Sequence, residues 1–410
     1  MTIPALHNKK VAVVGMGTNN RKLADYLKKQ GVNFEVIENW KNPNELIGKL
    51  DNFDVIFRTP GLPYLSKAVQ QAKARGVEIS SQTKLFFELC PAPIIGVTGT
   101  KGKGTTSSLI AKILEAAGKR VWLGGNIGKD PFGFLEQIST TDIVVLELSS
   151  FQLQDLEQSP HIAVVLDITS DHLNHHGSVE EYTDAKTSIL KYQTEKDFAI
   201  LYKSLPQTLQ NLGAGKKIFF TSSEASEYAT KLLGQHNREN IAAAVVCAKL
   251  LEIDEEAIKQ AVAVFEALPH RLKMIRQVNA ITYIDDAYST NIGPAEAAIR
   301  AMNGPTILIV GGYDKGLDFS SLGKTIAESK NIKVLVVIGI VAQKILDASK
   351  GFTGKILTGA KNMPEILQQA QSMAQPGDTI LFSPATSSFD MFKNETDRGD
   401  QFVKEVQSIK

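Results

Sequence analysis

The sequence predicts an α/β protein built from three consecutive domains, and three observations predict this fold class. The chain has 410 residues, enough for two or three domains of about 150 residues each. Short β-branched runs alternate with amphipathic stretches, the pattern of crossover units around a mostly parallel sheet. Proline-containing breaks at 90–93 and 268–271 interrupt this alternation. We therefore expect domains over residues 1–91, 92–267 and 268–410.

Composition excludes several classes of protein. Apolar residues make up 43% of the chain and charged residues 22%, which excludes collagen-like and disordered chains. The net charge of +1 provides no basic field to attract nucleic acid or anionic lipid. The longest apolar stretch, 334–342, is too short for a membrane helix, and the N-terminal run is too short for a signal peptide. Two distant cysteines, Cys90 and Cys247, suit a reducing compartment. We expect a cytoplasmic protein without membrane insertion.

The first domain contains part of a nucleotide-binding signature. Its expected elements are strands at 11–15, 34–38 and 54–57 and helices at 20–30, 42–50 and 67–75. Gly15 and Gly17 follow the first strand, but Asn20 stands where a third glycine would complete a dinucleotide fingerprint. Glu38 ends the next strand at the right distance. We expect a Rossmann-like domain whose first turn holds part of a nucleotide, while a redox cofactor is poorly supported.

The sharpest signal lies at 96–114, where a strand ends in a glycine-rich turn and opens into a helix. Gly99 and Gly102 let backbone N–H groups surround phosphate oxygens, and Lys103 can reach the terminal phosphates. The alternative to phosphate binding is that these glycines form a turn with only a structural role. Gly104 occupies the position after the lysine, where a hydroxyl residue usually binds Mg²⁺, so that role falls to the threonines that follow, Thr105 and Thr106. The central domain is therefore predicted to be P-loop ATPase-like.

Two further segments of the central domain carry chemistry. Glu147 ends a buried strand, where a carboxylate suits Mg²⁺ beside a triphosphate, although a strand-end Glu can simply face water. The segment 166–190 gathers acids and histidines that could bind zinc or merely form a polar loop: Asp167, Asp171, His172, His175 and His176. By composition alone, Lys186 would be one more solvated lysine.

The alternation continues to the end of the chain. Further strands are expected at 120–123, 143–147, 162–166, 198–201, 218–220, 281–285, 306–312, 333–339 and 379–384, and helices at 237–251 and 254–265. Polar clusters at 283–291, 310–320 and 382–402 each follow a strand-like run. Because such loops meet at one edge of a parallel sheet, we expect a Rossmann-like C-terminal domain with a substrate pocket there.

Taken in order, these motifs resemble the Mur ligase family, the ATP-dependent amide-forming ligases of peptidoglycan precursor synthesis. The resemblance covers nearly the whole chain and rests on TPG at 59–61, GTKGKGT at 99–105, GGNIG at 124–128, ELSSFQL at 147–153, DHL at 171–173, AK at 185–186, GQHNREN at 234–240, LPHRL at 268–272, GGYDKG at 311–316 and SPATSSFD at 383–390. It is greatest to members that add D-glutamate to UDP-N-acetylmuramoyl-L-alanine through an acyl phosphate. It implies ATP and Mg²⁺ as cofactors and a monomer.

The resemblance also implies residue roles. Catalytic residues would be Lys103, Glu147, His172 and Lys186, the last as a carbamate. Mg²⁺ would be held by Thr105, Glu147, His172 and Lys186. ATP would be bound by Gly99, Thr100, Lys101, Gly102, Lys103, Gly104, Thr105, Thr106, Asn237, Asn240, Arg271 and Asp286. The UDP-substrate would contact Gly15, Glu38, Asn39, Thr59, Asn126, Ser149 and Gln152. D-Glutamate would contact Thr290, Lys315 and Ser388.

Three positions depart from the family pattern, namely Trp40, Gly104 and Tyr288. The resemblance further implies that the C-terminal domain closes on ATP about a hinge near Leu268. Two other functions compete with this interpretation. A folylpolyglutamate synthase-like ligase would share the fold and the acyl phosphate chemistry, and a nucleotide-binding regulator would bind ATP without ligating anything.

Overall fold

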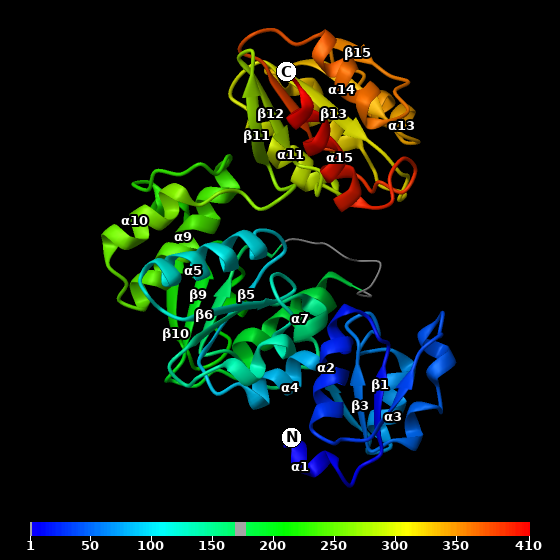
Figure 1. The fold of residues 1–410 in the computed structure, drawn as a ribbon, viewed down its shortest axis with the longest axis vertical. Coiled ribbons are helices and arrows are strands. Elements are labelled where there is room, and N and C mark those ends of the chain that lie inside the picture. Colours follow the sequence, from blue (N-terminus) through cyan, green and yellow to red (C-terminus); the bar gives the residue numbers. More distant parts are fainter. Residues whose placement is uncertain (1, 169–177) are drawn as a thin grey trace. The chain divides into compact units, whose positions relative to one another are not determined.

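A computed structural model describes residues 2–168 and 178–410 of the chain (Figure 1). These residues form three β-sheets and divide into two compact units. The first unit comprises residues 1–229 and 238–263, and the second comprises 230–237 and 264–410. The α/β class and the mostly parallel sheets predicted from the alternation are confirmed. Within the described residues, no helix is long and apolar enough to cross a membrane.

The first unit begins with a four-stranded parallel sheet in the order β2-β1-β3-β4. Its strands are β1 Val11–Val14, β2 Phe34–Ile37, β3 Val55–Arg58 and β4 Glu78–Ser81, and its helices are α1 Ile3–Leu6, α2 Thr18–Lys29, α3 Lys67–Ala74 and α4 Gln82–Leu89. The helix expected at 42–50 is absent. Short 3₁₀ turns occupy 43–46 and 50–52 instead, because Gly48 between them adopts φ +78°, which ends a helix.

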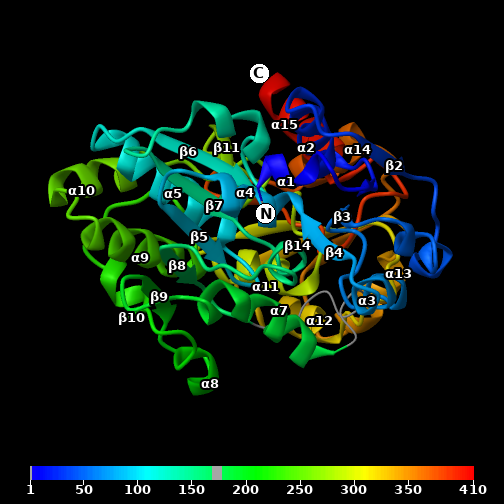
Figure 2. The ribbon, with the colours of Figure 1, turned by 90° about the horizontal axis from the view of Figure 1, so that it is seen from below.

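The second sheet of this unit has six parallel strands in the order β10-β9-β8-β5-β7-β6. Its strands are β5 Ile94–Thr98, β6 Val121–Gly125, β7 Ile143–Glu147, β8 Ile162–Val165, β9 Phe198–Tyr202 and β10 Lys216–Phe220. Its helices are α5 Lys103–Ala116, α6 Ser150–Leu153, α7 Val179–Lys191, α8 Gln207–Gln210, α9 Gln235–Leu250 and α10 Glu255–Val264, although residues 235–237 of α9 and the last residue of α10 belong to the second unit. In both ribbon views α9 and α10 lie side by side (Figures 1 and 2). The central strands are buried, so the sheet is covered on both faces.

The two sheets of the first unit share one hydrophobic core. Leu27 of α2 and Phe86 of α4 belong to the same buried cluster as Phe132 and Phe134 from the loop after β6. The rings of Phe86 and Phe134 meet edge to face, with their centroids 6.0 Å apart. This continuous apolar packing explains why the four-stranded sheet and the β5–β10 sheet form one compact unit.

The second unit contains a six-stranded sheet in the order β11-β12-β16-β13-β14-β15. Its strands are β11 Lys273–Val278, β12 Ile281–Asp285, β13 Thr306–Gly311, β14 Ile332–Ile338, β15 Lys355–Leu357 and β16 Thr379–Phe382. Its helices are α11 Ile292–Arg300, α12 Ser320–Glu328, α13 Ala342–Ala348, α14 Met363–Ser372 and α15 Glu395–Ser408. β11 pairs antiparallel with β12, and the remaining pairs are parallel. The loops after β12, β13 and β16 therefore meet at one edge of the sheet.

Candidate functional site

The glycine-rich turn between β5 and α5 is shaped by close backbone packing. Gly99 has φ +153°, and a Cβ there would lie 2.7 Å from the Cβ of Leu166. Gly102 has φ +82° and precedes the first residue of α5. A Cβ at Gly102 would lie 2.0 Å from Oδ1 of Asn240. The turn therefore requires glycine at both positions, and α5 points its N-terminal amides and the positive end of its dipole at this turn.

Two lysine side chains converge on one carbonyl oxygen of this turn. Lys103 Nζ donates to the carbonyl oxygens of Gly99 at 3.0 Å and Thr100 at 2.9 Å. Lys186 of α7 is only 2% exposed, and its Nζ donates to the same Gly99 oxygen at 2.9 Å. Lys186 is thus a buried cation at the turn, not a solvated side chain. Lysine side chains beside a helix N-terminus are suited to bind the oxygens of a polyphosphate.

A tyrosine connects α7 to the same turn. Tyr182 lies one helical turn before Lys186, with the lysine Nζ 4.6 Å from its ring centroid. Its hydroxyl donates to Oγ1 of Thr100 at 3.2 Å. Because Tyr182 is buried and contacts both the lysine and the loop, it holds the Lys186 side chain against the glycine-rich turn.

Glu147 ends β7 on the strand next to β5, with Val97 as its partner in the parallel ladder. It is only 6% exposed, so it does not face water. Its Oε1 accepts a hydrogen bond from Asn126 Nδ2 at 3.1 Å, and its backbone oxygen accepts one from the Asn126 amide at 2.9 Å. The structure thus brings Glu147 and Asn126 together at the carboxyl edge of the sheet, beside the strand that leads into the glycine-rich turn.

The start of α5 supplies hydroxyl groups at this edge. Thr105 and Thr106 are buried, and Thr106 Oγ1 donates to Oδ1 of Asn240 at 3.4 Å. Carboxylate and hydroxyl oxygens are the hard donors that Mg²⁺ prefers, so Glu147 and Thr105 fit that ion. No cluster of three acidic, histidine or cysteine side chains suited to a metal occurs among residues 2–168 and 178–410. His172, with the neighbouring Asp171, His175 and His176, lies outside the described residues.

The residues expected to contact the UDP-substrate lie in two places in the first unit. Gly15, Glu38 and Thr59 follow residues paired across β2, β1 and β3, so they meet at the carboxyl edge of the four-stranded sheet. Asn39 comes next, with φ +62° and an exposed side chain. At the other place, Ser149 caps α6, where its hydroxyl accepts from the backbone amide of Gln152 at 3.3 Å. The Gln152 Oε1 accepts in return from the Ser149 amide at 3.0 Å.

Asn20 replaces the third glycine of the nucleotide fingerprint and has a structural role. Its side chain is fully buried, and Nδ2 donates to the carbonyl oxygens of Val14 at 3.3 Å and Gly15 at 2.9 Å. The amide therefore closes the turn after β1 from the inside. Trp40, the nearby departure from the family pattern, packs partly buried against the apolar cluster of this sheet.

In the second unit, Asp286 lies in a buried hydrogen-bonded position after β12. Burial raises the pKa of its carboxyl group to about 7 and outweighs the hydrogen bonds that lower it. Those bonds come from Ser383 Oγ at 2.7 Å and from the Leu272 amide at 3.1 Å. Arg271 is exposed, with its guanidinium carbon 5.5 Å from the centroid of the Tyr288 ring. Asn237, also in this unit, donates through Nδ2 to the Leu233 oxygen at 2.7 Å.

The residues expected to bind D-glutamate lie on three loops at the edge of the sheet in the second unit. Lys315 is exposed, and its Nζ donates to the Thr290 oxygen at 3.3 Å. Ser388 is fully buried, and its hydroxyl has no hydrogen-bond partner among the described residues. A buried hydroxyl of this kind is costly unless a ligand or water completes it. Tyr288, which departs from the family pattern, carries no positive charge. Its hydroxyl forms a hydrogen bond of 2.7 Å with Thr396 Oγ1.

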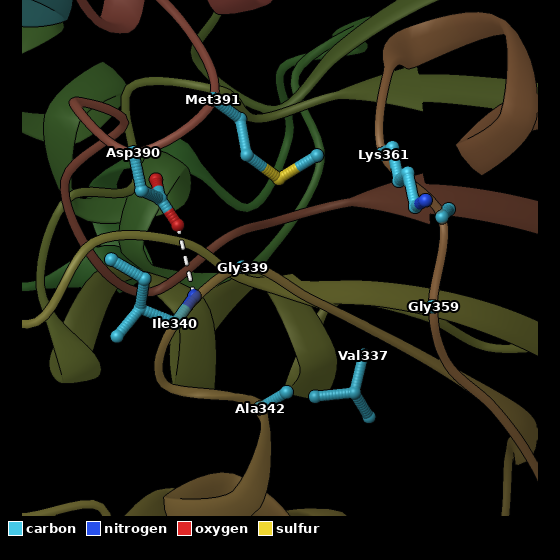
Figure 3. Close-up of a pocket in the computed structure, with 9 residues that line it drawn as sticks. Val337, Gly339, Ile340, Ala342, Gly359, Lys361, Asp390 and Met391 are labelled. Carbon is cyan, nitrogen blue, oxygen red and sulfur yellow. Dashed lines mark hydrogen bonds between the residues drawn. The ribbon is translucent and has the colours of Figure 1, made fainter.

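A hollow of about 480 Å³ opens at the ends of β14 and β15 in the same unit (Figure 3). It is lined by Val337, Gly339, Ile340, Ala342, Gly359, Ala360, Lys361, Asp390 and Met391. Asp390 Oδ2 accepts from the Ile340 amide at 2.9 Å, as the dashed line in Figure 3 marks. Thr290, Lys315 and Ser388 do not line this hollow, so it is distinct from the expected amino-acid site.

One buried ion pair was not expected from the sequence. The Arg58 and Asp155 side chains are each only 1% exposed and lie 2.8 Å apart between Nη2 and Oδ1. A sequence signal existed for Arg58 alone, because a charged residue ends an otherwise apolar strand. Asp155 follows α6 with no motif to distinguish it from a surface acid.

Comparison with known proteins identifies the class of protein that this fold and site define. Residues 97–212 match the Mur ligase middle domain, and residues 270–386 match the glutamate ligase domain of Mur ligases. The chain belongs to the Mur ligase family.

Individual relatives match nearly the whole chain. A UDP-N-acetylmuramoylalanine–D-glutamate ligase of Acetivibrio thermocellus is 34% identical, over 98% of this chain and 97% of the relative. The protein of the same name from Symbiobacterium thermophilum is also 34% identical, over 98% of each chain.

Solved structures share the fold at lower identity. The UDP-N-acetylmuramate-alanine ligase of Thermotoga maritima has a TM-score of 0.62 and 18% identity, covering 98% of this chain and 100% of that one. E. coli FolC, solved with DHPP and ADP, has a TM-score of 0.59 and 19% identity over 80% of this chain and 92% of that one. These two likenesses support the α/β architecture.

Proposed function

We propose that this chain is an ATP-dependent ligase that joins D-glutamate to UDP-N-acetylmuramoyl-L-alanine. The observation that carries the proposal is the ammonium group of Lys103, which lies at the glycine-rich turn where α5 begins. The substrates are inferred from the names of the relatives, whose sequences match 98% of this chain. The amide is made from a carboxylate and an amine, a reaction that requires activation of the carboxylate.

ATP supplies that activation as a substrate. A carboxylate oxygen of the terminal L-alanine attacks the γ-phosphorus, which forms an acyl phosphate and releases ADP. The two reacting groups are both anionic, so positive charge must offset their repulsion. Lys103 supplies it at the glycine-rich turn, and the α5 N-terminal amides hold the phosphate oxygens. When bound, Mg²⁺ would be held by Glu147 and Thr105, with His172 and the carbamate of Lys186 in the same proposed set, and would supply further charge neutralisation.

The second step forms the amide. The neutral amine of D-glutamate attacks the carbonyl carbon of the acyl phosphate, inorganic phosphate leaves, and the nitrogen loses a proton to solvent. In our proposal Thr290, Lys315 and Ser388 hold the carboxylates of the amino acid, which is supported by the unpaired buried hydroxyl of Ser388 and the exposed ammonium of Lys315. His172 and a carbamylated Lys186 complete the proposed catalytic set.

The remaining assignments belong to the same proposal. Gly15, Glu38, Asn39, Thr59, Asn126, Ser149 and Gln152 bind the UDP-substrate, and Asn237, Asn240, Arg271 and Asp286 complete the ATP site. We also propose a cytoplasmic monomer with three domains at the boundaries predicted from the sequence. These features agree with the chemistry of a ligase whose substrates are all soluble small molecules.

A phosphate-release assay tests the proposal. Purified protein is given ATP, Mg²⁺ and UDP-N-acetylmuramoyl-L-alanine with each of a panel of D- and L-amino acids. We expect phosphate release that requires both the sugar nucleotide and D-glutamate. Turnover with a pteroate acceptor and L-glutamate would instead favour a folylpolyglutamate synthase-like ligase. ATP binding without turnover on any acceptor would favour a nucleotide-binding regulator.

A further inference from the structure

A single buried guanidinium connects the loop after β3, which begins with Thr59, to the segment that carries Ser149 and Gln152. Arg58 is the last residue of β3, and it donates through Nε and Nη2 to the two carboxylate oxygens of Asp155, at 3.0 and 2.8 Å. Ser81 Oγ donates to the same carboxylate at 3.4 Å. The geometry is a bidentate fork, which fixes direction as well as distance. Both side chains are 1% exposed, so water does not loosen the contact.

The remaining donors of Arg58 bind one backbone oxygen on each side. Nη1 donates to the Leu62 oxygen at 3.1 Å, in the loop that begins with Thr59. Nη2 also donates to the Phe151 oxygen at 2.6 Å, inside α6 between Ser149 and Gln152. One side chain therefore fastens the loop after β3 to the helix after β7.

The free-energy cost of burying this ion pair indicates that its role is to hold the bound groups at fixed positions. Burying two charges removes their hydration, and apolar residues of similar size would often give equal or greater stability. A fork with five donors, however, can hold a carboxylate and two carbonyl oxygens at fixed positions, which an apolar pair cannot do. The surface ion pair between Lys84 and Glu157 joins the same parts of the unit but is largely exposed at the Glu157 side chain.

We propose that Arg58, held by Asp155, is a positioning residue that sets the separation between the 59–62 loop and the 149–153 segment. The UDP end of the substrate then meets the first segment while the muramoyl-alanine end meets the second. This inference rests on the proposed function for the identity of the substrate. It adds a residue pair that contacts no substrate atom and acts through Thr59, Ser149 and Gln152.

Binding measurements on the full chain test the inference. Arg58→Lys keeps the charge but loses the fork, and Glu157→Gln serves as the control that removes an exposed pair between the same parts. By calorimetry, Arg58→Lys should weaken binding of UDP-N-acetylmuramoyl-L-alanine at least tenfold and change binding of UDP alone by less than twofold. In turnover, the KM for ATP should stay within twofold. Equal binding of the complete substrate by Arg58→Lys and the wild type would overturn the inference.

A second variant separates positioning from folding. In Arg58→Met/Asp155→Leu the charges are replaced by apolar groups of similar size, so its melting temperature should lie close to that of the wild type. Its binding of the complete substrate should nevertheless be as weak as that of Arg58→Lys. Wild-type binding by this double variant would overturn the inference. If the wild type binds the sugar nucleotide but releases no phosphate with D-glutamate, the proposed function fails while the binding comparison still decides the role of Arg58.

Discussion

Buried charged side chains lie beside the glycine-rich turn, where we propose that phosphate binds, and the role of Lys186 is the most readily tested. Its ammonium reaches the Gly99 oxygen and stacks on Tyr182, yet the proposed mechanism needs it as a carbamate, which is negatively charged. Carbamylation would exchange a donor for two acceptor oxygens at the same place. The two states therefore differ in what they can bind, a cation or an anion.

Lys186→Ala should lower the rate of phosphate release by at least 10²-fold, because the proposed mechanism uses the carbamate of this lysine to hold Mg²⁺ beside the reacting phosphates. If the lysine acts as a carbamate, acetate or formate should restore part of the activity by supplying the missing carboxylate. Lys191→Ala, at the exposed end of the same helix, is the control and should keep wild-type turnover. Full activity of Lys186→Ala without added carboxylate would reject the role.

The Asp286 carboxyl should make stability depend on pH. Its pKa is about 7 in the folded chain against an ordinary value of 3.8, because burial disfavours the charged form. Between these values the folded state holds a proton that the unfolded state has lost. Stability therefore falls as pH rises through this window, by about 2 kcal/mol between pH 5 and 7 from this group.

Urea unfolding of wild type and Asp286→Asn at pH 5 and pH 8 measures this contribution. The variant cannot ionise, so its free energy of unfolding should fall less than that of the wild type over the same interval. Asp347→Asn, at an exposed position of α13, should reproduce the wild-type dependence. Identical pH dependence in wild type and Asp286→Asn would show that this carboxyl is already ionised at pH 5.

At the scale of elements, α5 has a glycine with positive φ at each end, and only one of them is crowded. A Cβ at Gly102 would meet Asn240 at 2.0 Å, whereas one at Gly118 would meet nothing within 4 Å. Gly118→Ala should therefore cost only left-handed strain, about 1–2 kcal/mol. Gly102→Ala should cost about 1–3 kcal/mol more, because Asn240 must move.

Chemical denaturation of the two variants measures that difference, and ATP titration adds a functional readout. Because Asn240 contacts the turn that holds phosphate in our proposal, Gly102→Ala should also weaken ATP binding, while Gly118→Ala should leave it unchanged. Equal destabilisation by both substitutions would mean that Asn240 moves aside at no cost.

Periodicity predicted most elements of the sheets but not those set by tertiary pairing. The strands expected at 143–147 and 306–312 appear as β7 and β13 within a residue of their bounds. The alternating residues of β11 were missed, since their hairpin turn uses Asn279 and Ala280, both at positive φ, in place of an Asn-Gly signal. The alternation of strand-like runs with amphipathic stretches also predicted a helix at 42–50, which Gly48 interrupts.

The candidate site was predictable where a motif joins residues close in sequence. The glycine-rich turn and Lys103 follow directly from one strand-turn-helix segment. The burial of Lys186 against Gly99 could not be read from composition, since the two residues are 87 positions apart. Arg58 and Asp155 are likewise joined across 97 positions, and only the packing of two sheets reveals their partnership.

For the whole molecule, the division into two compact units predicts two thermal transitions. Gly102 lies in the first unit and Asp286 in the second. In calorimetry, Gly102→Ala should lower the midpoint of one transition, and Asp286→Asn at pH 8 should raise that of the other. Hydrogen exchange read by mass spectrometry assigns each transition to its residues. A single transition shifted by both substitutions would show that the chain unfolds as one cooperative body.

The apolar packing between the first two sheets limits how this chain can exchange parts with its relatives. Severing residues 1–91 from the rest would expose Leu27 and Phe86 to water, and each such side chain loses roughly 2–3 kcal/mol of burial. Recombination that replaces the first ninety residues alone must therefore also supply matching partners for Phe132 and Phe134. Viable hybrids should inherit the two sheets of the first unit as one block, whereas the sheet of the second unit has its own apolar clusters and can be inherited separately.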